Sequence, residues 1–213
     1  MERIDTTRAY ELIREKITTL ALAPGAPIDP QALAEELEMA VIPVQEALKL
    51  LAHEELVTIT RRHGLYVSDV NIEDLDALSE TRMPLEGLCA RLAAERATAD
   101  DLVVLEALCA ETPTGSDGKE LFALDHRFHQ AIAAAAHNRY LARTLEQFFG
   151  LSQRLWFLAL PHLDFLPTSV EEHITIVEAI KAGRGDEAER LMNEHVRAFY
   201  DNVRNVFPLT ADS

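Results

Sequence analysis

One short stretch, residues 121–132, constrains the fold of this chain more than any other, because it carries charged and apolar side chains on one predicted helix face. At the helical period, Phe122, Asp125, His129 and Ile132 fall on that face. Residues four apart on a helix are neighbours, so the Asp125 carboxylate and the His129 imidazole are directed at one point. A carboxylate among apolar neighbours is costly unless an ion pair or a metal ion compensates it. The stretch therefore predicts a helix with a polar site on its apolar face.

Two later histidines have the same placement. His173 and His195 each lie on the apolar face of their own predicted helix. If these helices meet the helix of Asp125 and His129 in a bundle, three imidazoles and one carboxylate converge. This set of ligands suits zinc, nickel, cobalt, iron(II) or manganese, with positions left open for water or substrate oxygens. Spacing alone leaves open the alternative that each histidine packs separately in the core with a backbone partner.

The N-terminal third of the chain has the pattern of a winged helix-turn-helix. Apolar spacing predicts helices over residues 6–21 and 30–37, and a third helix that begins at Pro43. Two β-prone runs, residues 56–60 and 65–68, then flank a short polar turn, residues 61–64, that ends in glycine, which is typical of a hairpin. Three helices followed by a hairpin indicate a winged helix-turn-helix. The alternative is a small helical domain with an incidental hairpin.

The remainder of the chain has a helical pattern throughout. Asn71 is expected to cap the first of its helices, and residues 112–118 form the clearest loop. Further helices are predicted to begin near Ala99, to contain Asp125, to span residues 140–160, and to begin at Ser169 and at Asp186. The predicted fold class is mostly α. A winged helix-turn-helix domain with a small β-hairpin wing, residues 1–70, precedes an all-α antiparallel helical bundle, residues 71–213.

The charge of the chain limits how it can contact nucleic acid. The net charge is −16, and residues 1–70 hold 7 basic and 12 acidic residues, a net charge of −5. Any contact with nucleic acid must therefore be a local patch that works against the overall field.

Other classes of protein find little support in the sequence. The chain has no run of eighteen apolar residues that would cross a membrane, and its start lacks the apolar core of a signal peptide. Cys89 and Cys109 have no metal-ligand spacing, and a reducing, cytoplasmic setting is expected. There is no Gly-x-Ser-x-Gly turn, phosphate loop or dinucleotide fingerprint, so an enzyme is not expected.

Three runs in the N-terminal domain resemble the DNA-binding domain of GntR-family bacterial transcription regulators, over residues 7–69. They are Gln31–Leu37, Pro43–Leu48, and Gly64–Val67 after Leu56-Val57. Two departures from the family pattern affect the residues expected to contact DNA. The family usually has Ser-Arg-Thr where this chain has Ala40-Val41-Ile42, and Arg where this chain has Gln45. The residues left as candidates for DNA contact are Gln45, which can read adenine, Lys49, and the wing residues Arg61, Arg62, His63 and Gly64.

Residues 72–206 resemble the FCD domain, the all-helical ligand-binding domain of the FadR-like branch of that family. The matching motifs include Arg82 with Leu85-Glu86, Asp125-x3-His129, Glu172-His173 and Met192-x2-His195. The resemblance implies that Asp125, His129, His173 and His195 bind one divalent metal ion, with zinc the first candidate. It also implies a small organic acid at or beside the metal, with Arg82 as its counter-charge. The alternative for Arg82 is a structural ion pair with Glu86.

Together these observations predict a one-component regulator that binds operator DNA, a metal ion and a small carboxylate effector, with no membrane partner. Helix-turn-helix proteins read paired half-sites, so a homodimer is expected. One alternative is a metal-dependent sensor that has lost specific DNA binding, which the net charge of residues 1–70 and the missing cationic residues favour. The other is a metalloenzyme acting on a small hydroxy acid, although no general base beside the site is evident.

Overall fold

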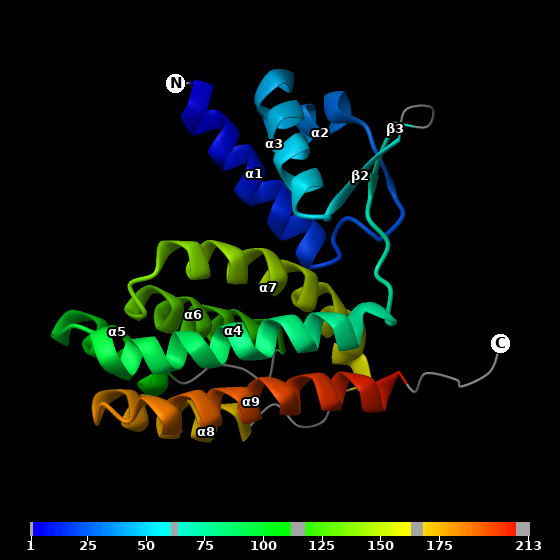
Figure 1. The fold of residues 1–213 in the computed structure, drawn as a ribbon. Helices are drawn as coiled ribbons and strands as arrows, with labels where there is room; N and C mark the ends of the chain where they lie inside the picture. Colours follow the sequence, from blue (N-terminus) through cyan, green and yellow to red (C-terminus); the bar gives the residue numbers. More distant parts are fainter. Residues whose placement is uncertain (1, 61–63, 112–117, 163–167, 208–213) are drawn as a thin grey trace. The chain divides into compact units, whose positions relative to one another are not determined.

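The computed structural model describes residues 2–60, 64–111, 118–162 and 168–207 of the chain (Figure 1). The chain divides into two compact units. One comprises Met1–Asn71 with Gly150–Leu158, and the other comprises Ile72–Phe149 with Ala159–Ser213. No helix among the described residues is both long and apolar enough to cross a membrane.

The first unit contains a helix-turn-helix. Helix α1 spans Glu2–Thr18, α2 spans Pro30–Glu36 and α3 spans Val41–His53. The Asp29 side chain accepts a hydrogen bond from the backbone N–H of Gln31 at 2.9 Å, which caps α2, and Pro30 occupies a first-turn position where its missing N–H is not needed. With the sheet that follows, these helices confirm the predicted winged helix-turn-helix. Helix α3 begins two residues before Pro43, the expected start.

The sheet has three strands where the sequence predicts two. Strands β2, Val57–Thr60, and β3, Gly64–Val67, pair antiparallel as the expected hairpin. A further strand, β1, Pro27–Ile28, pairs with the other edge of β3, so the strand order is β1-β3-β2. Strand β1 has only two residues, and one of them is a proline without an N–H, so it leaves no alternating pattern by which the sequence could reveal it.

Apolar side chains from all these elements form the core of the first unit. Ile13 and Ile17 of α1 and Leu48 and Leu51 of α3 are almost completely buried, and Val67 of β3 packs with them. The remaining members of this core are Ala9, Ile28, Leu33, Ala34, Val44, Ala47, Leu56 and Val57. Burying each large aliphatic side chain stabilises the fold by roughly 1.5–3 kcal/mol.

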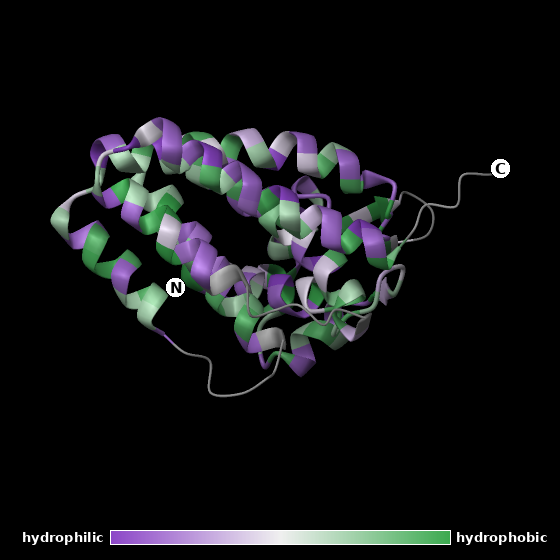
Figure 2. Ribbon diagram, turned by 90° about the horizontal axis from the view of Figure 1, so that it is seen from below, coloured by the Kyte–Doolittle hydropathy of each residue, from purple (hydrophilic) through white to green (hydrophobic). Residues whose placement is uncertain are grey.

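The second unit is all-α among its described residues, which confirms the predicted helical bundle. Its complete helices are α4, Asp74–Arg96; α5, Ala99–Ala110; α6, Gly118–Ala135; α8, Thr168–Lys181; and α9, Gly185–Val206, with a short 3-10 turn at Leu160–His162. Helix α7, Arg139–Ala159, is divided between the units, because its residues Gly150–Leu158 belong to the first. In Figure 2, hydrophobic and hydrophilic residues are interspersed along the helical ribbons.

Helices α4 and α9 lie side by side along much of their length (Figure 1). Gly87 of α4 allows this close approach, because a Cβ atom at that position would clash with the side-chain amide of Asn193 on α9. Since α4 carries Arg82 and Glu86 and α9 carries His195, this contact helps to set the distance between residues of the candidate site.

Two predicted helix starts are wrong. Helix α4 begins at Asp74 after Glu73, so Asn71 is not its cap, and α8 already includes Thr168, so Ser169 lies inside the helix. A capping box that the sequence analysis did not identify begins α5, where the N–H of Asp101 donates to Thr98 Oγ1 and the N–H of Thr98 donates to the Asp101 carboxylate at 2.8 Å. Most of the predicted loop at 112–118 lies outside the described residues.

The first unit offers a matched pair for testing its core. Leu51 is completely buried and its neighbour Leu50 is 48% exposed on the same helix. We expect Leu51→Ala to lower the free energy of unfolding by about 2–5 kcal/mol, because it leaves a cavity, and Leu50→Ala to change it by less than about 0.5 kcal/mol. Urea denaturation followed by circular dichroism measures both. Equal losses in the two variants would contradict this packing of α3.

Candidate metal centre

Three helices of the second unit direct four side chains to one point. Asp125 and His129 come from α6, His173 from α8 and His195 from α9. One ligand atom from each residue can be chosen such that all four lie within 4.8 Å of one another. The spacing of four residues between Asp125 and His129 puts both on one face of α6, and helix packing brings the two C-terminal histidines to the same place.

Most of the distances between these atoms are close to those around a bound metal ion. The Nε2 atom of His195 lies 3.2 Å from Nε2 of His129 and 3.3 Å from Nε2 of His173. Oδ1 of Asp125 lies 3.2 Å from Nε2 of His173 and 3.7 Å from Nε2 of both other histidines. Nitrogen and oxygen ligands bind zinc at about 2.0–2.2 Å, so ligand atoms around one ion lie roughly 3–3.6 Å apart. The four residues therefore fit a small divalent cation.

The three imidazoles are buried, and they are directed at one another. His129, His173 and His195 are only 5–8% exposed, and their Nε2 atoms face each other rather than backbone partners. Imidazole nitrogens that meet at such distances need a shared proton or a cation between them. The alternative in which each histidine packs separately with a backbone partner does not describe this geometry.

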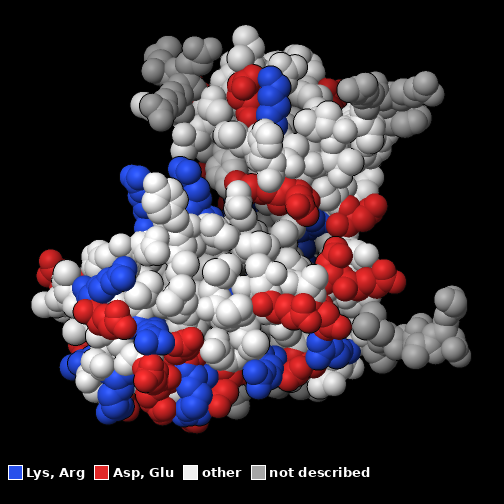
Figure 3. Space-filling view, viewed as in Figure 1, with Lys and Arg blue, Asp and Glu red and all other residues white. Residues whose placement is uncertain are grey.

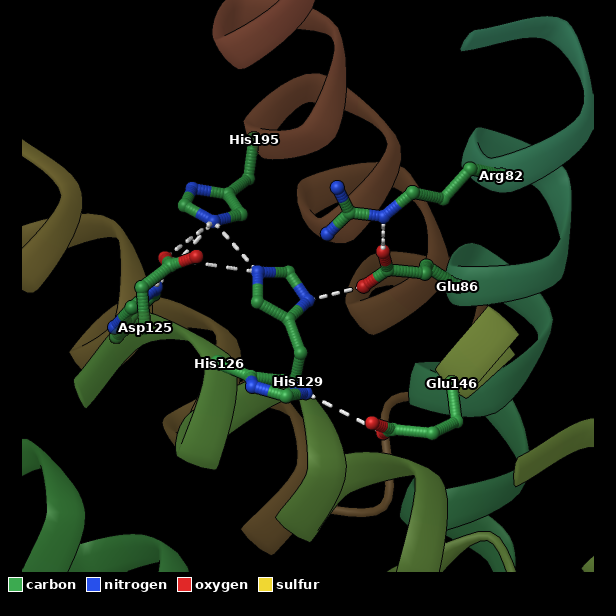
Figure 4. Close-up of polar contacts among 8 residues, drawn as sticks. Arg82, Glu86, Asp125, His126, His129, Glu146 and His195 are labelled. Carbon is green, nitrogen blue, oxygen red and sulfur yellow. Dashed lines mark hydrogen bonds and ion pairs between the residues drawn. The ribbon is translucent and has the colours of Figure 1, made fainter. Parts of the chain in front are cut away.

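Two carboxylates hold the outer nitrogens of two of these imidazoles. His129 Nδ1 donates to Glu86 of α4 (Figure 4). His195 Nδ1 lies 2.6 Å from the Glu172 carboxylate. A carboxylate at Nδ1 fixes the tautomer that leaves Nε2 free to bind a metal. His173 is held differently, because its ring stacks on Phe128 with centroids 3.7 Å apart. The sequence analysis had not assigned this role to Glu86 or Glu172.

Arg82 forms the ion pair that the sequence analysis kept as its alternative role. Its Nε donates to Glu86, which lies one helical turn later on α4, and both side chains are about 4% exposed. The guanidinium also lies over the ring of Phe149, 4.4 Å from its centroid. Burial alone would raise the pKa of Glu86, but attraction from Arg82 and His129 outweighs it and lowers this pKa to about 2. Glu86 is therefore ionised at neutral pH.

The proposed metal ligands differ in how readily they release protons. Burial opposes the charged form of each, yet the neighbouring histidines hold the pKa of Asp125 well below its usual value. Burial lowers the pKa of His173, while the carboxylates of Asp125 and Glu172 outweigh burial and raise that of His195 to about 9. Metal binding needs neutral imidazoles, so an incoming cation must displace protons from His195, and its affinity must fall as the pH is lowered.

A cavity of about 340 Å³ lies beside this centre, between α6 and α7. Glu86 and His129 contribute to its wall, and the wall continues through Phe149 and His126, whose rings stack 3.9 Å apart. Nε2 of His126 lies 3.3 Å from the Glu146 carboxylate, away from the metal ligands (Figure 4). A cavity of this size suits a small molecule.

The predicted DNA-contacting residues belong to the first unit and lie apart from these ligands in the sequence. Gln45 and Lys49 are exposed on α3, and Lys49 pairs with Glu46 at 2.7 Å. Gly64 is the first residue of β3, with φ at +96°, where glycine is favoured. Arg61, Arg62 and His63 lie outside the described residues. On the face drawn in Figure 3, the described residues of the first unit form no continuous basic surface.

Comparisons with known proteins agree with this architecture. Residues 5–67 match the family model described as bacterial regulatory proteins, gntR family, and residues 77–198 match the FCD domain. The transcriptional repressor RspR of Escherichia coli K12 is 26% identical over 200 residues, covering 92% of this chain and 88% of RspR. The galactonate operon transcriptional repressor of the same strain is 27% identical over 214 residues, covering 89% and 90%.

Among solved structures, E. coli McbR/YncC has a similar fold. Its TM-score is 0.85 at 22% sequence identity, and the match covers 94% of this chain and 97% of that chain.

The metal site generates a prediction whose control is a histidine of α6 that is not one of the four ligands. We expect His173→Ala to lose stoichiometric metal and to unfold at a lower temperature, since a ligand that binds only the native state stabilises it by about 4 kcal/mol at a thousand times its dissociation constant. His126→Ala should keep the metal, because His126 points away from the four ligands. Elemental analysis of natively purified protein measures both. Full metal content in His173→Ala would refute the site.

Proposed function

Because the chain belongs to the GntR family of bacterial regulatory proteins and carries an FCD domain, we propose that it binds operator DNA under the control of a small carboxylate at a metal centre. Its relatives are transcriptional regulators, and the chain is a regulator rather than an enzyme. The observation that carries the proposed control is the convergence of three imidazoles and one carboxylate within 4.8 Å, with further carboxylates behind two of the imidazoles.

The two functions are assigned to different parts of the chain. Residues 1–70 are the operator-binding domain, and residues 71–213 are the metal- and effector-binding domain. A helix-turn-helix of this kind reads two half-sites about one helical turn apart, which requires a homodimer. The effector changes operator affinity only as far as it binds one arrangement of the regulator more tightly than another.

Asp125, His129, His173 and His195 are the proposed ligands of one divalent cation, with zinc the first candidate and nickel, cobalt, iron or manganese the others. The cation supplies a Lewis acid to which a carboxylate oxygen can bind. The carboxylates of Glu86 and Glu172 orient two of the imidazoles toward it.

The effector is proposed to be a small organic acid. One relative is named for the galactonate operon, and galactonate is a sugar acid. Arg82 remains the proposed counter-charge, because its hydrogen bond to Glu86 is made by Nε. Figure 4 draws its other two guanidinium nitrogens directed toward the side where His195 lies. A guanidinium can bind a carboxylate through two such N–H groups.

A metal-dependent sensor without specific DNA binding is the second candidate. The pairing of Lys49 with Glu46 favours it, since this ion pair leaves the outward face of α3 with no net positive charge from these two residues. The net charge of −5 over residues 1–70 acts in the same direction. An experiment on DNA binding itself decides between the two.

The effector site is tested by a thermal-shift screen of small organic acids, hydroxy and sugar acids included. We expect at least one acid to raise the melting temperature of metal-loaded protein, because binding to the native state adds to its stability. After chelation the same acid should have little effect, and Arg82→Lys should reduce the shift by losing bidentate contact. An acid that stabilises metal-free and metal-loaded protein equally would show that the metal is not part of the effector site.

Operator binding is tested by selection from genomic fragments, followed by titrations at several salt concentrations. We expect an enriched two-fold sequence whose binding depends only weakly on salt concentration. Each phosphate contact contributes roughly one unit to the log–log slope of affinity against salt, and the predicted DNA-binding residues include few cationic side chains. Gln45→Ala should relax base preference more than it lowers general affinity. The double variant Arg61→Ala, Arg62→Ala should weaken binding to all sequences alike. If no sequence is enriched, with or without metal and acids, the sensor without DNA binding is the better description.

A further inference from the structure

The first turn of α3 exposes a large apolar side chain. Ile42 is 61% exposed, while the two residues that follow it, Pro43 and Val44, are buried. The family that this chain resembles usually has Ser-Arg-Thr where this chain has Ala40-Val41-Ile42, so Ile42 stands where a threonine is usual. An isolated side chain offers too little area for a stable protein interface, which needs several hundred square ångströms on each partner.

The position of Ile42 in the helix-turn-helix points to DNA. Helix α3 is the second helix of this motif, and in such motifs the N-terminal residues of the second helix contact base edges in the major groove. Gln45, Glu46 and Lys49 follow Ile42 by three, four and seven residues, so all four share one face, and all four are exposed. Ile42 therefore stands on the same face as the residue expected to read adenine.

The charges on that face narrow what Ile42 can recognise. Lys49 is paired with Glu46 at 2.7 Å, so these two charges compensate each other, and the uncharged groups beside them are the amide of Gln45 and the sec-butyl side chain of Ile42. Among base edges in the major groove, only thymine presents a methyl group, and adenine presents the donor and acceptor that a glutamine amide can match. Both groups belong to A·T base pairs.

We propose that Ile42 is a specificity-determining residue that packs against the C5 methyl group of a thymine in the operator half-site in which Gln45 binds an adenine. This inference rests on the proposed operator binding and adds to it the chemistry of the bases that α3 reads. Recognition by a methyl contact needs no cation, which suits a face whose charges are already paired.

The test uses the full-length, metal-loaded protein and the operator obtained by selection. Each thymine of the operator is replaced in turn by deoxyuridine, which pairs identically and lacks only the C5 methyl group. We expect one position in each half-site at which the replacement weakens binding about fourfold, the equivalent of exposing one methyl group. Ile42→Ala should bind the thymine and uracil duplexes equally at that position, while keeping its preference for the adenine.

Two control variants separate this role from a general effect on α3. Leu50→Ala removes another exposed apolar side chain of the same helix, which lies eight residues and so roughly 12 Å along the axis from Ile42, and should keep the full preference for thymine. Gln45→Ala should keep the preference for thymine and lose that for adenine. Because Ile42 is exposed, Ile42→Ala should keep the circular dichroism spectrum and metal content of the unsubstituted protein.

The outcomes distinguish this inference from the function on which it rests. If an operator is found and every uracil duplex binds as well as its thymine counterpart, the methyl contact is refuted while operator binding stands. The same conclusion follows if Ile42→Ala retains the preference for thymine. If selection enriches no sequence, operator binding itself fails, and the assignment of Ile42 fails with it.

Discussion

The polar interior of the helical unit depends on Glu86. This buried carboxylate accepts hydrogen bonds from Arg82 and from His129, and so joins a cation of α4 to an imidazole of α6. A buried charge is tolerated only when its partners are complete, and removing one partner of a buried pair typically costs 3–5 kcal/mol. Glu86 therefore does two things at once: it stabilises Arg82 inside the bundle and it fixes the orientation of His129.

The contacts that form the candidate site therefore also hold the helices of the bundle together. Helices α4, α6, α8 and α9 each contribute a residue that binds another member of the group, with Glu172 of α8 holding His195 of α9 in the way that Glu86 holds His129. A ligand that changes the charge or the coordination at this centre acts on all of these helices together. Such a group is suited to biasing two arrangements of a regulator, which is what the proposed effector control requires.

The winged unit has a different electrostatic character. Lys49 and Glu46 compensate each other on α3, and an isoleucine and a glutamine occupy positions where the family usually has polar or cationic residues. If this surface binds operator DNA as proposed, it gains little from phosphate attraction, and a larger part of its affinity has to come from base edges.

Much of this architecture was determined by local sequence. Apolar spacing identified the helices of both units, and the i, i+4 placement of Asp125 and His129 indicated a shared polar site, because periodicity is a property of neighbouring residues. Only the tertiary structure decided what depends on residues distant in the chain. It paired the two-residue strand β1 with β3, brought His173 and His195 to within 3.3 Å of each other, and assigned Glu86 and Glu172 to the imidazoles. These contacts depend on how helices pack, and no local pattern records the distance between side chains of different helices.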